Sequence, residues 1–211
     1  MLNETIKTYD KIAEKYAKKH WHTVLLSDEK DEFAQKCKGK KVLDAGCGPG
    51  IYTSFLLSKG FKVISVDLSS GMLKEAKKRV PKGRFYLMSV TKLKFPARRF
   101  DGVFCSAVLL HLNDDEANRT IKEFYRVIKP GGLLFISTKM GRKQTVKVYP
   151  DGTKRFIHFY TFKFLKESLE KNGFGVEESH KNMKDADGDV WLCIFARKHD
   201  TNPTNNQKPA D

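Results

Sequence analysis

The sequence lacks the features that would place the chain in a membrane or on a secretory route. No run approaches the roughly 20 apolar residues that a spanning helix needs. Residues 1–16 contain acids, and they have neither the apolar core of a signal peptide nor the acid-poor pattern of a transit peptide. We therefore expect a cytoplasmic protein with no membrane partner.

Cysteine is scarce, and its spacing excludes two common uses of the residue. The four cysteines stand at positions 37, 47, 105 and 193, so there is no C-x-x-C pair and no Cys/His cluster with zinc-ligand spacing. We expect reduced thiols and no metal site. Cys105 and Cys193 lie in apolar, strand-like runs and are expected in the core.

Acidic residues are also few relative to basic ones. The 40 lysines and arginines exceed the 25 acids and give a net charge of +15. Such a surface can attract RNA or an acidic substrate. Lysine nevertheless outnumbers arginine 31 to 9, whereas bidentate phosphate recognition favours arginine, and no RNA-binding motif with stacking aromatics is visible. The excess therefore favours a lysine-rich surface slightly over an RNA-binding one, and both interpretations stay open.

What is present is an alternation of helical patterns and short apolar runs. A helix is predicted over residues 4–19, where Ile6, Tyr9 and Ile12 share one face. Strands are predicted over residues 41–45, 61–67, 84–89, 100–106 and 133–138. The helices predicted between them cover residues 51–58, 70–80 and 114–127. This alternation predicts an α/β protein with a parallel sheet.

The alternation breaks after residue 138. Two strand-like runs flank the turn sequence Tyr149-Pro-Asp-Gly-Thr153, so residues 142–160 are predicted to form an inserted β-hairpin. A helix that Thr161 can cap and two antiparallel strands are expected to follow it. The expected organisation is one domain over residues 1–198, with a helical lid (1–40), the hairpin (142–160) and a disordered polar tail (199–211).

The chemistry is predicted at the turn that follows the first strand. Gly46, Gly48 and Gly50 allow the backbone to bend sharply and to approach a ligand. A dinucleotide fingerprint needs its third glycine one residue later, where Ile51 stands. Asp44, at the strand end, would repel a pyrophosphate and attract an ammonium group. This pattern argues against a dinucleotide-dependent oxidoreductase.

Four segments in order carry a resemblance to a known family. Residues 42–50, VLDAGCGPG, resemble the first motif of the class I S-adenosylmethionine-dependent methyltransferases. Residues 66–73, 100–112 and 124–132 resemble the second motif, the fourth motif and the segment that leads into the fifth strand. The resemblance runs from about Tyr9 to Thr138. It implies a Rossmann-like, seven-stranded sheet, mostly parallel with an antiparallel C-terminal strand, and helices on both faces.

The resemblance also implies S-adenosyl-L-methionine as cofactor and S-adenosyl-L-homocysteine as product. Asp44 would hold the methionyl ammonium, directly or through water, and Asp67 would hold the ribose. Where many relatives carry an aspartate for the adenine amino group, this chain has Ser89, a weaker acceptor. The remaining residues that it assigns to the cofactor are Tyr9, Tyr16, Gly46, Cys47, Gly48, Leu68, Met72, Val90 and Ser106.

His111, just beyond the fourth strand, is the candidate general base, because a histidine pKa suits proton transfer near neutral pH. Capping of the next helix, or a hydrogen bond to the backbone, is the alternative interpretation of this residue. The inserted hairpin is the candidate acceptor determinant, since loops over a rigid sheet carry specificity. The predicted substrate residues are Trp21, His111, Arg155, His158 and Tyr160, with His20, His22 and Arg142 as further candidates.

The predicted function is methyl transfer from S-adenosylmethionine to an acceptor, for which a small molecule is favoured. An RNA (tRNA) methyltransferase is the first alternative, because residues 42–100 carry 12 basic and 3 acidic side chains. A non-catalytic S-adenosylmethionine-binding partner is the second, since its binding motifs would look the same.

Overall fold

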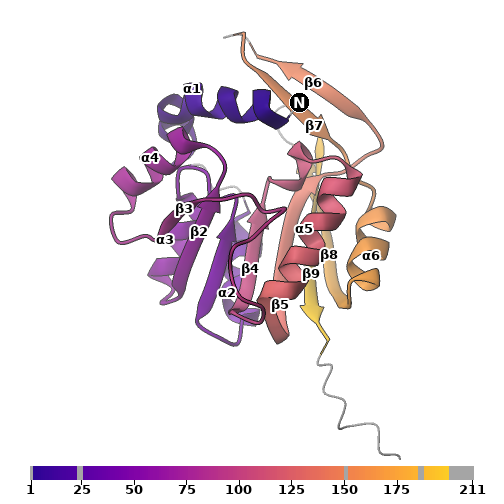
Figure 1. Ribbon diagram of the computed structural model, residues 1–211. Helices are drawn as coiled ribbons and strands as arrows, with labels where there is room; N and C mark the ends of the chain where they lie inside the picture. Colours follow the sequence, from indigo (N-terminus) through magenta and orange to yellow (C-terminus); the bar gives the residue numbers. More distant parts are fainter. Residues whose placement is uncertain (1, 23–25, 150–151, 185–187, 200–211) are drawn as a thin grey trace, which may run out of the picture.

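A seven-stranded sheet forms the centre of the protein (Figure 1), whose computed structural model describes residues 2–22, 26–149, 152–184 and 188–199. The strand order is β3-β2-β1-β4-β5-β9-β8. The first five strands are parallel, and β9 runs antiparallel to both of its neighbours. The bounds are β1 Lys41–Ala45, β2 Lys62–Asp67, β3 Phe85–Leu87, β4 Phe100–Ser106, β5 Ile128–Lys139, β8 Phe174–Lys184 and β9 Val190–Lys198.

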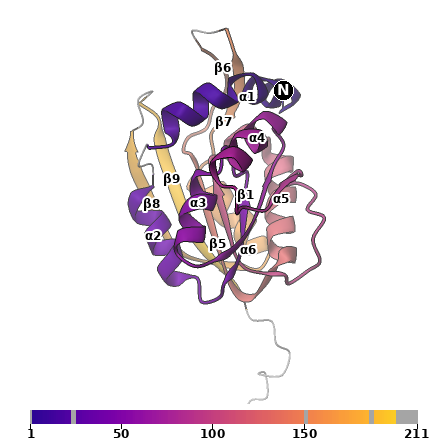
Figure 2. The same ribbon diagram turned by 90° about the vertical axis from the view of Figure 1, so that its left-hand side faces the viewer.

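Helices cover both faces of the sheet, which is why its central strands are apolar on both sides. On one face α2 and α3 pack around Phe104 and Phe135, and on the other α5 and α6 pack around Val103 and Leu134. Figure 2 shows α2 and α5 on opposite sides. Helix α4 packs along β2 and β3. The bounds are α2 Ser27–Lys36, α3 Ile51–Ser58, α4 Ser70–Arg79, α5 Asp114–Val127 and α6 Phe162–Lys171.

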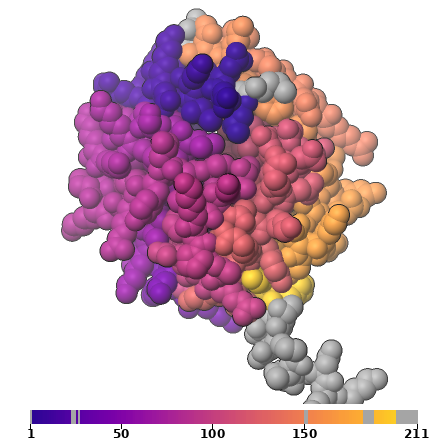
Figure 3. Space-filling model, in the orientation of Figure 1, coloured from indigo at the N-terminus to yellow at the C-terminus, as the bar shows by residue number. Residues whose placement is uncertain are grey.

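The first helix and the inserted hairpin lie together over the sheet. Helix α1 (Leu2–His20) crosses above the carboxyl ends of the parallel strands, beside the antiparallel pair β6 (Gln144–Val148) and β7 (Lys154–His158). The Thr8 hydroxyl donates to the Lys154 carbonyl at 2.7 Å, and the Phe156 amide donates to the Thr5 hydroxyl at 3.0 Å. In Figure 3 the indigo atoms of α1 adjoin the orange atoms of the hairpin at the top of the molecule.

Most predicted elements are confirmed, and the differences lie at their ends. Ser69 and Thr161 cap α4 and α6 through their side chains. Strand β5 begins at Ile128, five residues before the prediction, because the segment after α5 already pairs with β4 at Phe100. Cys105 and Cys193 are buried in the core. The tail predicted over residues 199–211 lies, apart from His199, outside the described residues.

Among the described residues no helix combines the length and the apolarity that crossing a membrane requires.

Candidate active site

A cavity of about 500 Å³ lies at the carboxyl ends of the parallel strands, beneath α1. The lining includes every residue predicted to bind the cofactor except Asp44, and it includes His111 and His20. Residues from α1, the glycine turn, β2, the segment after β3 and the end of β4 therefore meet in one place. This is where open α/β sheets bind ligands.

The backbone geometry of the turn after β1 requires glycine at two positions. Gly46 and Gly48 have φ angles of 75° and 53°, a region that favours glycine. A Cβ atom on Gly46 would lie 2.1 Å from the Val108 side chain, whereas one on Gly48 would meet no atom within 4 Å. The turn thus packs tightly against the β4 loop at Gly46 and leaves open space at Gly48.

Asp67 ties the end of β2 to this turn. Its Oδ2 accepts the Gly48 amide and its Oδ1 accepts the Ser69 amide, both at 2.8 Å. Burial raises the pKa of this carboxyl, although the amide hydrogen bonds oppose the effect. The carboxylate is held by backbone groups, and a carboxylate oxygen can still accept a hydroxyl from the cavity.

Asp44 does not reach the cavity, which corrects the expectation of a direct contact with a ligand. The side chain is 1% exposed, and the Thr53 hydroxyl on α3 donates to its Oδ2 at 2.6 Å. Burial raises its pKa to about 7. When ionised, Asp44 can influence a ligand only through its electric field, from beneath the glycine turn.

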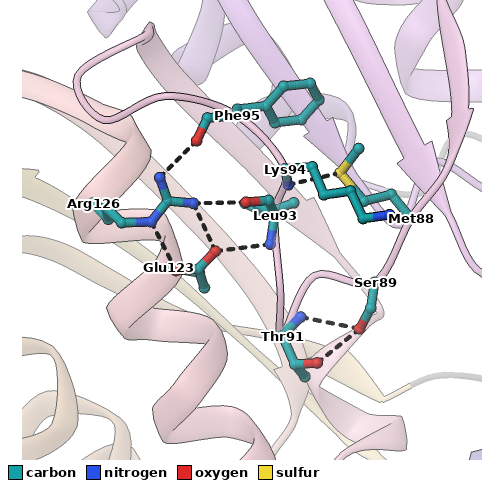
Figure 4. Close-up of polar contacts among 8 residues, drawn as sticks. All are labelled: Met88, Ser89, Thr91, Leu93, Lys94, Phe95, Glu123 and Arg126. Carbon is teal, nitrogen blue, oxygen red and sulfur yellow. Dashed lines mark hydrogen bonds and ion pairs between the residues drawn. The ribbon is translucent and has the colours of Figure 1, made fainter.

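Ser89 stands at the start of a loop that side chains from α5 hold in place (Figure 4). Arg126 donates to the carbonyls of Phe95 and Leu93 at 2.6 and 2.7 Å, and Glu123 accepts the Leu93 amide at 2.7 Å. The Thr91 amide donates to the Ser89 hydroxyl at 3.2 Å. The Ser89 oxygen therefore has one acceptor position occupied within its own loop.

Hydrogen bonds from two consecutive residues hold α1 above the cavity, one to the segment after β4 and the other to the start of α4. The Tyr9 hydroxyl lies 2.9 Å from Nε2 of His111. The next residue, Asp10, accepts the Ser69 hydroxyl at 2.7 Å and the Gly71 amide at 2.8 Å at the start of α4. Sequence reasoning missed Asp10, because an acid on a helix surface gives no signal of a distant partner.

The tautomer of His111 follows from its two contacts. The other ring nitrogen, Nδ1, lies 2.8 Å from the carbonyl oxygen of Phe156, which can only accept, so Nδ1 carries the hydrogen. Nε2 is then the acceptor that receives the Tyr9 hydroxyl. Burial lowers the pKa of His111 to about 4, so the ring is neutral at neutral pH.

Three predicted substrate residues are not brought to the cavity, which corrects those expectations. Trp21 packs on the apolar cluster around Leu73, with the Arg79 guanidinium over its ring. His158 pairs with Asp114 at 2.9 Å, and Tyr160 is 1% exposed, with its hydroxyl donating to backbone carbonyls that include that of Leu112. The aromatic face of the hairpin, to which His158 and Tyr160 belong, packs onto the core, because burial there removes the most apolar area from water.

The remaining candidates also lie outside the lining. His22 and Arg142 are exposed. Arg155 stacks on Tyr149, with its guanidinium carbon 3.7 Å from the ring centroid, and its Nη1 lies 3.4 Å from the Tyr9 hydroxyl. Arg155 therefore meets the site through Tyr9 and not directly.

Several lining residues were not predicted. Asp28 and Glu29 come from α2, Tyr52 from α3, Met88 from the loop after β3, and Trp191 from β9. Only Tyr52, next to the glycine turn in sequence, could have been inferred from the motif. The others reach the cavity through tertiary packing.

Comparisons with known proteins agree with this geometry. A family model for a methyltransferase domain matches residues 43–136. An uncharacterised methyltransferase of Oceanobacillus iheyensis is 30% identical over 173 residues, which are 75% of this chain and 77% of that protein. A ubiquinone biosynthesis O-methyltransferase of Coxiella burnetii is 31% identical over 151 residues. That match spans 64% of this chain and 64% of the relative's length.

Two solved structures share the fold. A Burkholderia thailandensis 1,6-didemethyltoxoflavin-N1-methyltransferase aligns with a TM-score of 0.74 at 23% identity, covering 94% of this chain and 88% of its own. A Methanosarcina mazei S-adenosylmethionine-dependent methyltransferase aligns with a TM-score of 0.70 at 24% identity, covering 77% of this chain and 93% of its own.

Proposed function

Because the chain belongs to the class I S-adenosylmethionine-dependent methyltransferases, we propose that it transfers a methyl group from this cofactor to a small-molecule acceptor. One observation carries the proposal: the glycine turn, the backbone-held Asp67 and the roof made by α1 all line the same cavity of about 500 Å³. Cavities of about 300–1,000 Å³ are typical of small-molecule sites. We take residues 1–198 as the methyltransferase unit.

The residues present fit the cofactor. The open space at Gly48 admits a close ligand, and Asp67 can accept ribose hydroxyls beside it. Leu68 and Met72, which line the same region, would pack against the adenine, and the Val90 amide would face the ring. The negative charge of Asp44, beneath the turn, suits a cation and disfavours a phosphate.

The names of relatives support a small acceptor. The Coxiella burnetii relative is named for methylation in ubiquinone biosynthesis, and the Burkholderia thailandensis structure contains 1,6-didemethyltoxoflavin with S-adenosylhomocysteine. The roof of α1 and the hairpin also favours a molecule that fits inside the cavity over a base presented on a large RNA.

Bound S-adenosylmethionine would supply the electrophilic methyl group. The protein would supply alignment and exclusion of water, and alignment alone is worth about 7–11 kcal/mol. We assign His111 as the proton acceptor, because it lines the cavity and its neutral Nε2 accepts the hydroxyl of Tyr9, which lines the cavity as well. A proton from an acceptor hydroxyl or amine can reach Nε2 when the Tyr9 hydroxyl passes on its own proton or gives up the bond.

Calorimetry and a labelling experiment test this function. We expect S-adenosylhomocysteine to bind and NAD not to bind. With methyl-labelled cofactor and separate metabolite, protein and RNA fractions, we expect the label in the metabolite fraction. Binding of NAD alone would overturn the proposal, and label in the RNA fraction would replace the small molecule with the RNA alternative.

A further inference from the structure

The edge of the sheet at β3 is strongly basic. Residues 76–100, which run from the end of α4 through β3 to the start of β4, contain nine basic and no acidic residues. Strand β3 is the edge strand, and α4 packs against it (Figure 1). Four of the nine arginines of the chain fall within this stretch. The scarcity of arginine that argued against RNA binding by the whole chain therefore does not hold here.

The basic side chains on both sides of β3 in sequence are exposed and unpaired. Lys82 and Arg84 lead into the strand, and Lys92, Lys94 and Arg99 follow it; all five are exposed. Among the described residues none of the five forms an ion pair with an acid, whereas lysines on α1, α2 and α6 pair with glutamates of their own helix. Uncompensated like charges repel one another and attract an anion.

The acids that contact this stretch do not neutralise it. Glu123 on α5 accepts the Leu93 amide at 2.7 Å and pairs with Arg126 at 2.8 Å, as Figure 4 shows. Asp101, which directly follows the stretch, pairs with Lys129 and accepts backbone amides from the start of β1. Both carboxylates therefore already have cationic partners elsewhere in the fold.

Aromatic side chains stand between these cations. Tyr86 on β3 is 45% exposed, and its ring meets that of Phe95 edge to face, with the centroids 6.4 Å apart. The Arg99 guanidinium lies over the same Phe95 ring, 5.3 Å from its centroid. An exposed aromatic ring among cations is typical of surfaces on which the bases of single-stranded nucleic acids stack.

An acidic peptide is the other ligand that such charges could attract. A peptide of this kind would add to the free edge of β3, and main-chain hydrogen bonds would supply its affinity. Strand β3 spans only Phe85–Leu87 and therefore offers few of these bonds. The exposed Tyr86 ring favours a base over a peptide.

We propose that this face of the protein binds single-stranded RNA, whose phosphates contact the cations while one base stacks on Tyr86. RNA commonly exposes such unpaired bases in its loops and ends. None of the residues of the face lines the cavity, so the inference goes beyond the proposed function and does not rest on it. The β3 face consists of Lys82, Arg84, Tyr86, Lys92, Lys94 and Arg99.

Fluorescence anisotropy with a labelled oligouridylate of about 12 nucleotides tests the inference on the full chain. At about 150 mM salt we expect a Kd of about 1–10 μM. The slope of log Kd against log salt should be about 3 to 4, because each phosphate contact on a single strand contributes about 0.7. A Kd above about 100 μM at this salt, or a slope near zero, would overturn the inference.

A charge-removal variant locates the binding surface. The Kd should rise at least about tenfold, and the salt slope should fall by about 2 to 3, when four cations of the β3 face are replaced together. The changes are Lys82→Gln, Arg84→Gln, Lys92→Gln and Lys94→Gln. Calorimetry should show an unchanged Kd for S-adenosylhomocysteine in this variant, since none of the four residues lines the cavity.

The matched control removes the same kinds of charge from α5, from α6 and from β8, the strand at the opposite edge of the sheet. It should raise the Kd of the RNA by less than about threefold. Equal losses in the two variants would mean that only the net charge attracts RNA, and would overturn the inference. The control changes, all at exposed positions, are Arg119→Gln, Lys163→Gln, Lys171→Gln and Lys181→Gln.

Two further measurements test the choice of RNA. Tyr86→Ala should raise the Kd at least about fivefold, the lower end for a stacked base, and Tyr86→Phe should stay within about twofold. No loss in Tyr86→Ala, or displacement of the RNA by an equal concentration of oligoglutamate, would overturn the assignment to RNA. Failure of the wild-type protein to bind S-adenosylhomocysteine would instead overturn the proposed function and leave this inference standing.

Discussion

The side of the cavity made by β1, β2 and β4 is assembled from short stretches of sequence, whereas the roof joins segments far apart in the chain. Gly48 and Asp67, which meet at 2.8 Å, are 19 residues apart. Thr5 and Phe156 are 151 residues apart, and Tyr9 and His111 are 102 apart. The first side lines the cavity with the glycine turn and the Asp67 carboxylate, and the roof lines it with side chains of α1 such as Tyr9. Substitutions in the two regions should therefore separate cofactor binding from turnover.

The largest expected effect is on turnover, from the candidate base that the roof contacts. His111→Ala should lower turnover about 100-fold, the lower end for loss of a general base, and should leave the Kd of S-adenosylhomocysteine within about twofold. Steady-state kinetics and calorimetry measure the two quantities. His22→Ala, an exposed histidine outside the lining, is the control. Unchanged turnover in His111→Ala would end the assignment of this residue as the base.

The next effect concerns stability beneath the turn. Folding raises the Asp44 pKa to about 7, so the folded state holds the proton more tightly and loses stability as pH rises from about 4 to about 7. Asp44→Asn removes this loss and should raise the free energy of unfolding by about 2 kcal/mol at pH 8, with little difference near pH 4. Urea unfolding at both pH values measures it. A variant that is less stable at pH 8 would contradict the expected ionisation.

A smaller effect is expected on cofactor affinity. Asp67→Ala should raise the Kd of S-adenosylhomocysteine at least about tenfold, because it removes the ribose acceptor and an anchor of the Gly48 amide. Asp115→Ala, an exposed acid on α5, serves as the control. An unchanged binding isotherm for Asp67→Ala would remove the ribose assignment and, with it, the contrast between the two regions.

The smallest effect should come from the link between roof and base. Tyr9→Phe removes the hydroxyl at His111 but keeps the ring, so turnover should fall about three- to fivefold and cofactor affinity should stay within about twofold. Tyr86→Phe, on the exposed edge strand β3, provides a matched comparison. A loss of affinity as large as the loss of turnover would show that Tyr9 acts on the cofactor and not through His111.

Local chemistry is the reason that much of this protein could be predicted from its sequence. The glycine turn needs positive φ at Gly46 and Gly48, which restricts the residue type there. Ser69 and Thr161 cap the helices that follow them. The order of the parallel strands follows from the family motifs. The glycine turn and the two caps depend on contacts within a short segment, whereas the strand order is implied by the motifs of the family.

The roof and the charged lining depend on packing between distant segments, which a single sequence does not reveal. The hairpin was predicted, but the direction of its aromatic face was wrong for His158 and Tyr160, because burial in the core outweighs exposure to the cavity. Glu29 and Trp191 are far apart in sequence and are brought to the cavity by α2 and β9. The sequence by itself thus determined the sheet, the glycine turn and the family. Only the tertiary structure decided which side chains face the ligand, since burial and hydrogen-bond partners are set when the layers pack together.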